Sequence, residues 1–203
     1  MKHLINLFKM RIKRILLLSL TGILLTTFNA SAQKNLAFKA NISVDGTSNT
    51  HDWTVKSDNV PGTFVISEEN QISALTFKVS VESLKSIIDS KFERKQMENL
   101  VLKAFNSEKN PVITFQLTEP FTPVISGSNV TVTLTGNLNM AGVTKRISFK
   151  SEGKLIAGGG YQFKASLPLK FTDYGMKPPV ALLIMKVKDP VNVKMDITIP
   201  IIN

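Results

Sequence analysis

The chain has 203 residues, of which 25 are Lys or Arg and 15 are Asp or Glu, and it contains no cysteine. The absence of cysteine excludes disulfide bonds, thiolate metal sites and cysteine nucleophiles. The excess positive charge is carried mostly by isolated lysines rather than by an arginine-rich stripe, so it does not indicate binding to nucleic acid.

The first 32 residues have the three parts of a secretory signal peptide. Five basic residues come first, an apolar run follows at residues 15–28, and Ala30-Ser31-Ala32 supplies the small residues that signal peptidase accepts. A membrane anchor is the alternative, but this apolar run is shorter than the about twenty residues that span a bilayer. We therefore expect cleavage after Ala32, a mature chain that starts at Gln33, and a periplasmic or secreted protein.

Removal of this leader changes the charge of the protein. The remaining 171 residues hold 20 basic and 15 acidic residues, so the net charge falls from +10 to +5. An excess of this size suits an anionic membrane surface or a phosphate-bearing ligand. No cysteine lies near the predicted cleavage site, which excludes a lipid anchor attached there.

Alternation of apolar and polar residues, typical of strands with one buried face, recurs along the mature chain. Strands are predicted at residues 38–44, 75–81, 113–117, 130–138, 147–149, 161–171 and 191–199, with an eighth in the apolar run 181–187 and weaker candidates at 53–56 and 63–66. A long antiparallel sheet with one apolar face must close or fold onto itself. The sequence therefore predicts one all-β domain over residues 33–203, as a barrel or a tight sandwich.

Turn residues are expected between these strands. Asp45-Gly46 would end the first strand, Ala141-Gly142 would form a tight hairpin, Gly158-Gly159-Gly160 a flexible loop, and Lys188-Asp189-Pro190 the break before the last strand.

The alternation stops between residues 83 and 110, where residues 93–105 show helical periodicity. One apolar face would be formed by Met97, Leu100, Val101 and Ala104. Asn110-Pro111 would stop the helix before the next strand. We expect a single helical insertion that plugs or caps the barrel.

Few residues of the mature chain suit catalysis or metal binding. His51 is its only histidine, and Asp52 beside it would point to the opposite face of a strand. A metal site usually needs two or three imidazoles or thiolates, and the glycine loop lacks the pattern that binds phosphate. We predict no catalytic residue, no metal and no cofactor, and interpret His51 as a structural or rim residue. An enzyme remains a third hypothesis.

Aromatic residues are more informative. Five phenylalanines on apolar strand faces would either fill the core or line an elongated cavity. They are Phe77, Phe115, Phe149, Phe163 and Phe171. Residues 171–179, which end in a double proline, are either a strand that bends over the barrel end or a mouth-lining segment in which Lys177 faces an anion.

Four stretches carry a resemblance: residues 46–54 (GTSNTHDWT), 105–115 (FNSEKNPVITF), 134–145 (LTGNLNMAGVTK) and 172–179 (TDYGMKPP). In this order and spacing the chain resembles the YceI-like family of exported, lipocalin-like proteins over nearly all of its mature length. The resemblance implies an eight-stranded antiparallel lipocalin-like β-barrel with a helical insertion and an interior that holds a long isoprenoid or similar amphiphile. Many members carry an Arg-Asp-x-His-Leu-type segment at the helix start. Residues 93–100 contain no histidine here, so any ligand role of that histidine does not transfer.

The leading hypothesis is an exported, non-enzymatic binding or carrier protein for a polyisoprenoid or other amphiphilic lipid, with a membrane surface as a further contact. Nucleic acid is not expected as a partner, and no oligomeric state is predicted. The apolar part of the ligand would lie among the aromatic residues, and a polar or phosphate head would meet cationic residues at the rim. The predicted ligand-binding residues are Phe77, Phe115, Phe149, Phe163, Phe171, Tyr174, Met176, His51, Arg94 and Lys177. The alternative is a structural or protein-interaction barrel of the cell envelope with a filled core.

Overall fold

The computed structural model describes residues 33–157, 160–181 and 185–199. The predicted signal peptide lies outside the described residues, as do Gly158 and Gly159 of the predicted glycine loop. Within the described ranges, no helix is long and apolar enough to span a bilayer.

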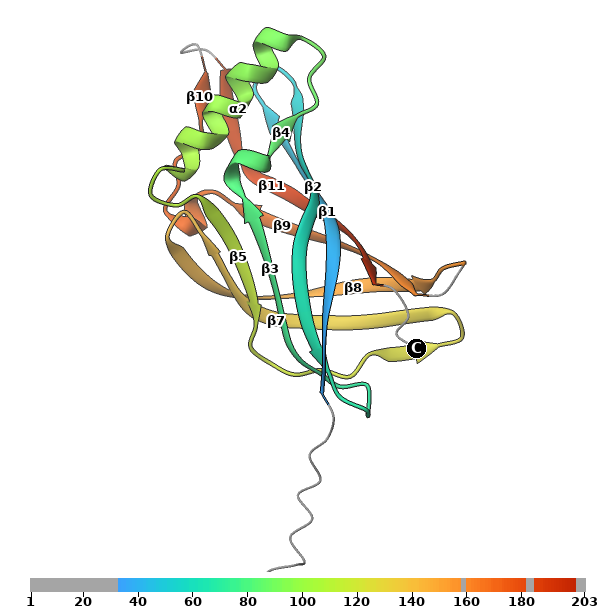
Figure 1. The fold of residues 1–203 in the computed structure, drawn as a ribbon. Helices are drawn as coiled ribbons and strands as arrows, with labels where there is room; N and C mark the ends of the chain where they lie inside the picture. Colours follow the sequence, from blue (N-terminus) through green and yellow to red (C-terminus); the bar gives the residue numbers. More distant parts are fainter. Residues whose placement is uncertain (1–32, 158–159, 182–184, 200–203) are drawn as a thin grey trace, which may run out of the picture. The chain divides into compact units, whose positions relative to one another are not determined.

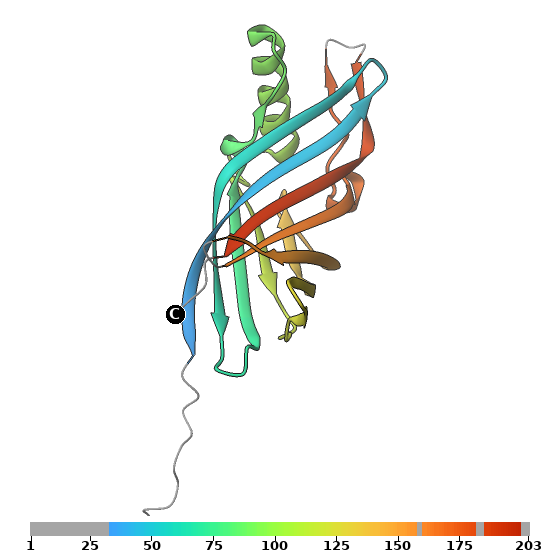
Figure 2. The ribbon, with the colours of Figure 1, turned by 90° about the vertical axis from the view of Figure 1, so that its right-hand side faces the viewer.

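Eight long strands form a closed antiparallel barrel (Figure 1). They are β1 (Lys34–Ser48), β2 (Asp52–Ile66), β3 (Ile72–Ser80), β5 (Val112–Leu117), β7 (Asn129–Met140), β8 (Val143–Leu155), β9 (Tyr161–Lys170) and β11 (Met185–Ile199). Their order around the barrel is β1-β11-β9-β8-β7-β5-β3-β2, and pairing of β2 with β1 closes the ring. Figure 2 shows β1, β2, β11 and β9 side by side on one wall. The predicted all-β barrel of about eight strands with one helical insertion is confirmed.

The remaining elements are short strands, turns of 3-10 helix and one α-helix. Three short strands, β4 (Lys85–Ser86), β6 (Val124–Ser126) and β10 (Val180–Ala181), pair with β2, β7 and β11. Two single turns of 3-10 helix are η1 (Val81–Ser83) and η2 (Thr172–Tyr174). The helix α2 (Lys91–Phe105) packs against β4 and η1 at one end of the barrel (Figure 1).

The ends of α2 follow from two polar residues. The Ser90 side chain accepts a hydrogen bond from the Glu93 backbone N–H at 3.4 Å and so caps the first turn. Asn106 adopts the left-handed conformation that ends a helix, with φ of 49°. The helix predicted at residues 93–105 is therefore confirmed, and it ends at Asn106 rather than at Asn110-Pro111.

Strand β2 is a single strand of 15 residues, although the sequence predicts only two weak fragments within it. Its register against β1 shifts between Ala40 and Ile42, where Asn59 adopts a positive φ of 57°. Asn59 donates its backbone N–H to the Asn41 side-chain oxygen at 3.2 Å. This bulge moves the buried positions from odd to even residue numbers, which interrupts the alternation and hides the strand.

Near the C-terminus, a predicted strand and a predicted turn differ from the structure. The separate strand predicted at residues 181–187 is wrong: β10 stops at Ala181, residues 182–184 lie outside the described residues, and β11 begins at Met185. Lys188-Asp189-Pro190 is not a turn either, because it lies within β11. The register of β11 against β1 shifts there, with Ser48 opposite Val187 and Gly46 opposite Val191. A polar, proline-containing bulge has the same composition as a turn, which explains the error.

The two other turn predictions have opposite outcomes. Ala141 and Gly142 both have positive φ, 51° and 82°, and join β7 to β8 in a tight hairpin as predicted. Asp45-Gly46 does not end the first strand, because β1 continues to Ser48.

Gly46 belongs instead to a set of strand glycines that are each covered by an aromatic ring. The pairs are Gly46 with Trp53, Gly62 with Phe38, Gly136 with Phe115 and Gly153 with Phe163. A Cβ on any of these glycines would lie 2.1–2.5 Å from the nearest ring atom. The missing side chain therefore makes the space that lets each ring lie against the neighbouring strand.

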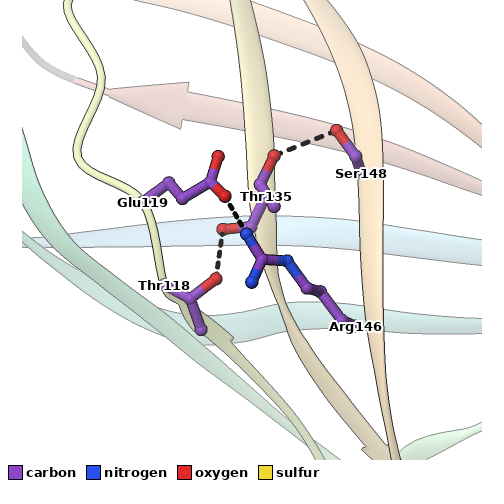
Figure 3. Close-up of polar contacts among 5 residues, drawn as sticks. All are labelled: Thr118, Glu119, Thr135, Arg146 and Ser148. Carbon is purple, nitrogen blue, oxygen red and sulfur yellow. Dashed lines mark hydrogen bonds and ion pairs between the residues drawn. The ribbon is translucent and has the colours of Figure 1, made fainter.

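On the outer face, polar contacts join the chain after β5 to β7 and β8 (Figure 3). Thr118 donates its backbone N–H and its hydroxyl to the Thr135 carbonyl, at 2.9 and 3.2 Å. The Thr135 and Ser148 hydroxyl oxygens are 3.0 Å apart, and Arg146 forms an ion pair with Glu119. Because that ion pair is exposed, it contributes little to stability, and the contacts mainly fix the strand register.

Candidate ligand cavity

The barrel interior beneath α2 contains a cavity, which we name the helix-side cavity. All eight barrel strands and α2 contribute to its lining. Its volume is about 110 Å³. Among the described residues, Lys170 is the only charged residue in the lining. The cavity therefore suits a hydrocarbon chain far better than a polar solute.

The apolar face of α2 closes this cavity at one end. Met97, Leu100, Val101 and Ala104, which the helical periodicity places together, all contribute to the lining. Met97 is buried and the other three are half-buried. The helix thus caps the barrel, and its exposed face carries Lys95, Asn99 and other polar residues.

Three phenylalanine rings cluster at the opposite limit of the helix-side cavity. Phe77 and Phe115 stack with ring centroids 5.2 Å apart, and Phe149 meets Phe115 edge-on at 5.7 Å. Phe115 is only 1% exposed, so this cluster is the most deeply buried aromatic contact of the site. Phe171 lines the cavity as well.

Phe163, which the sequence groups with these residues, lies elsewhere. It lines a second apolar cavity of about 80 Å³, which we name the distal cavity, together with Phe38, Phe64 and Leu75. Four of the five predicted phenylalanines therefore share one cavity and the fifth belongs to another. Their contact with a ligand stays a prediction.

The predicted rim residues do not gather at the helix-side cavity, since its lining includes none of His51, Arg94 and Lys177. His51 is exposed in the turn between β1 and β2, where its Nδ1 lies 3.1 Å from the Thr50 hydroxyl. Arg94 donates hydrogen bonds to the backbone carbonyls of Ile88 and Asp89, at 2.9 and 3.2 Å, and so holds the loop before α2. Lys177 is exposed.

The segment 171–179 runs along the cavity in part. Phe171 and Pro179 belong to the lining, whereas Tyr174 and Met176 are buried outside it. Burial, and secondarily the charge of Asp173, raise the pKa of the Tyr174 hydroxyl above its usual value.

Asp189 braces the start of this segment. Its carboxylate accepts hydrogen bonds from the Thr172 backbone N–H at 3.0 Å and the Thr172 hydroxyl at 2.6 Å. The hydroxyl first, and then the N–H, hold the pKa of Asp189 below its usual value. Asp189, which lies in the bulge of β11, therefore fixes Thr172 directly after Phe171, a residue of the cavity lining.

Lys170 and Trp53 are two of the lining residues that the predicted site omits. Lys170 falls in the outward phase of its strand together with Lys164, and only its position next to Phe171 could indicate it. Trp53 lies in a strand that the bulge conceals, although its segment is part of the family resemblance. It is 6% exposed, and its indole Nε1 is a buried polar atom without a hydrogen-bond partner.

Metal binding has no obvious site in the same region. Among the described residues, no group of three or more His, Cys, Asp or Glu side chains is arranged to hold a metal ion.

Comparisons with known sequences match this description. The YceI-like domain matches residues 27–199. UPF0312 proteins of Pseudomonas aeruginosa (strain LESB58) and Pseudomonas paraeruginosa are 32% and 31% identical over 123 residues, which are 57% of this chain. The matched segment spans 59% of the length of these curated relatives.

Solved structures share the fold at low identity. BcnA of Burkholderia cenocepacia is 15% identical with a TM-score of 0.59, over 79% of this chain and 96% of that one. A polyisoprenoid binding domain from Saccharophagus degradans, implicated in plant cell wall breakdown, is 16% identical with a TM-score of 0.59, over 83% and 97%. Identities this low establish a common fold.

Proposed function

This chain belongs to the YceI-like domain family, as its resemblance predicts, and we propose that it is a non-enzymatic binding or carrier protein for a long apolar ligand of the isoprenoid or lipid class. The observation that carries the proposal is the helix-side cavity, which is lined from all eight strands and α2 by apolar side chains. The fold shared with a polyisoprenoid binding domain supports the same ligand class.

The apolar lining of the cavity favours a hydrocarbon chain. Each buried methylene contributes roughly 0.8 kcal/mol of binding free energy. Affinity would then depend on apolar contact, and among the described lining residues the exposed Lys170 carries the only charge that a polar end would meet.

The filled-core alternative, a structural or protein-interaction barrel of the envelope, has one observation in its favour. Val124, Ile125 and Leu155 are 69%, 58% and 48% exposed near the end of the barrel that holds the distal cavity. Against it stand the two apolar cavities among the described residues, because a barrel with a purely structural role has no need of them.

Export through a cleaved signal peptide belongs to the same proposal, since the five basic residues, the apolar run and Ala30-Ser31-Ala32 have the expected order. Protein recovered from the periplasmic fraction would begin at Gln33. An intact N-terminus in the membrane fraction would favour the anchor instead.

Ligand retention tests the function directly. Protein purified under gentle, detergent-free conditions should carry an isoprenoid or another lipid that native mass spectrometry detects. Farnesol added to delipidated protein should change the fluorescence of Trp53, which is the only tryptophan of the chain and lines the cavity. A protein that carries no lipid and shows no response to prenyl alcohols would exclude this function.

Lys170 is expected to recognise a phosphate head. Lys170→Ala should weaken binding of farnesyl phosphate about fivefold, a loss of about 1 kcal/mol that high salt diminishes, and leave farnesol binding unchanged. Titration calorimetry at two ionic strengths measures both ligands. Lys177→Ala is the matched control, since both lysines are exposed but Lys177 lies outside the lining. Equal losses for alcohol and phosphate would show that Lys170 contributes only its hydrocarbon stem.

A further inference from the structure

The two apolar cavities lie in series along the barrel, because the same strands line both of them. On β3, Leu75 lines the distal cavity and Phe77 the helix-side cavity. On β8, the corresponding residues are Ser151 and Phe149. These are consecutive inward-facing positions, so the cavities are separated by one layer of side chains.

At the level of that layer, three strands carry small residues at their inward-facing positions. On β1, β7 and β9, the inward positions between the two linings are Ala40, Gly136 and Ala165. Such residues leave the centre of the barrel open at this level unless side chains from other strands fill it. The rings of Phe77, Phe115 and Phe149 contact one another next to this level, with centroid separations of 5.2 and 5.7 Å.

Gly136 holds the middle ring of this layer. A Cβ at Gly136 would lie 2.5 Å from the Phe115 ring and 2.4 Å from the Gln116 carbonyl oxygen. Phe115 therefore lies against the backbone of β7, in contact with both other rings, and is 1% exposed.

We propose that Phe77, Phe115 and Phe149 form a septum that sets the length of the apolar chain this barrel accepts. A chain that enters beneath α2 would extend until it meets these rings. The distal cavity, which is also apolar, would stay inaccessible from the helix side while they remain stacked. The inference rests on the proposed function and adds the residues that determine chain length.

A series of prenyl alcohols tests the septum. Geraniol, farnesol, geranylgeraniol and geranylfarnesol are titrated against delipidated protein, with Trp53 fluorescence and calorimetry as readouts. Affinity should rise by at least about 100-fold for each five-carbon isoprene unit that is buried and then reach a plateau. In Phe115→Ala the two cavities join, so the plateau should move to a chain at least one isoprene unit longer.

A second substitution checks where the extra length goes. Leu134 lines only the distal cavity, and Leu134→Phe would reduce its volume. This change should leave the wild-type plateau unaltered and should return the Phe115→Ala variant to the shorter plateau. An identical plateau in wild type and Phe115→Ala would overturn the septum but leave the proposed function intact. No binding of any alcohol to the wild type would instead overturn the function itself.

Loss of folding in Phe115→Ala does not end the test. Phe149→Leu keeps apolar bulk and should give a smaller shift of the plateau in the same direction. Crosslinking of unmodified protein by a farnesol analogue with a diazirine at its apolar end provides a measurement without substitution. The label should attach to helix-side residues, and attachment to Phe38 or Phe64 in the distal cavity would contradict the septum.

Discussion

Replacing Ala104 with phenylalanine should weaken binding of a prenyl alcohol by at least about 100-fold. Ala104 lies on the inner face of α2 and lines the helix-side cavity, so a ring at this position would occupy the space that the ligand needs. Displacing about four buried methylene groups at roughly 0.8 kcal/mol each accounts for such a loss. Farnesol titration by Trp53 fluorescence and by calorimetry measures it.

The matched control is Asn99→Phe, which places the same ring on the exposed face of the same helix. Helix propensity adds up to about 0.7 kcal/mol of instability in Ala104→Phe alone, because alanine is the best helix former whereas asparagine and phenylalanine rank close together, so the folded fraction of both variants is checked by circular dichroism. Wild-type affinity in Asn99→Phe and loss of affinity in Ala104→Phe would locate the ligand beneath α2. If Ala104→Phe binds farnesol normally, the ligand lies elsewhere.

Replacing Gly136 with alanine should destabilise the protein by about 3 kcal/mol, at the upper end of what overpacking costs. The added Cβ would meet a backbone carbonyl oxygen and the Phe115 ring, both closer than 3.0 Å, and a backbone atom cannot rotate away. The midpoint of thermal unfolding should therefore fall by roughly 6–12 °C for a domain of this size. Thermal unfolding followed by circular dichroism provides the measurement.

Asn137→Ala provides the comparison for Gly136→Ala, since Asn137 is the next residue of β7 and is exposed. Its free energy of unfolding should stay within about 0.5 kcal/mol of wild type. A Gly136→Ala variant as stable as Asn137→Ala would show that β7 can move away from β5, and the close contact with Phe115 would lose its importance.

The sheet could be predicted wherever alternation was uninterrupted. β1, β3, β7, β9 and the later part of β11 each keep one apolar face over many residues, and the sequence predicts all of them. The helix was predictable for the same reason, because its apolar side chains recur at helical spacing. Bulges were not predictable: Asn59 reverses the phase of β2, and Asp189-Pro190 within β11 has the composition of a turn.

The sequence predicted which kinds of residue form the site better than it predicted which of them lie together. The sequence by itself determined that phenylalanines would face the interior and that α2 would present Met97, Leu100, Val101 and Ala104 on one side, because periodicity along one element is a local property. The tertiary structure decided which of these residues meet. Strand register and tilt place Phe77, Phe115 and Phe149 together, Phe163 in a separate cavity, and Lys170 rather than Lys177 in the lining. Contacts between strands depend on register across the whole barrel, and no single segment of sequence encodes that register.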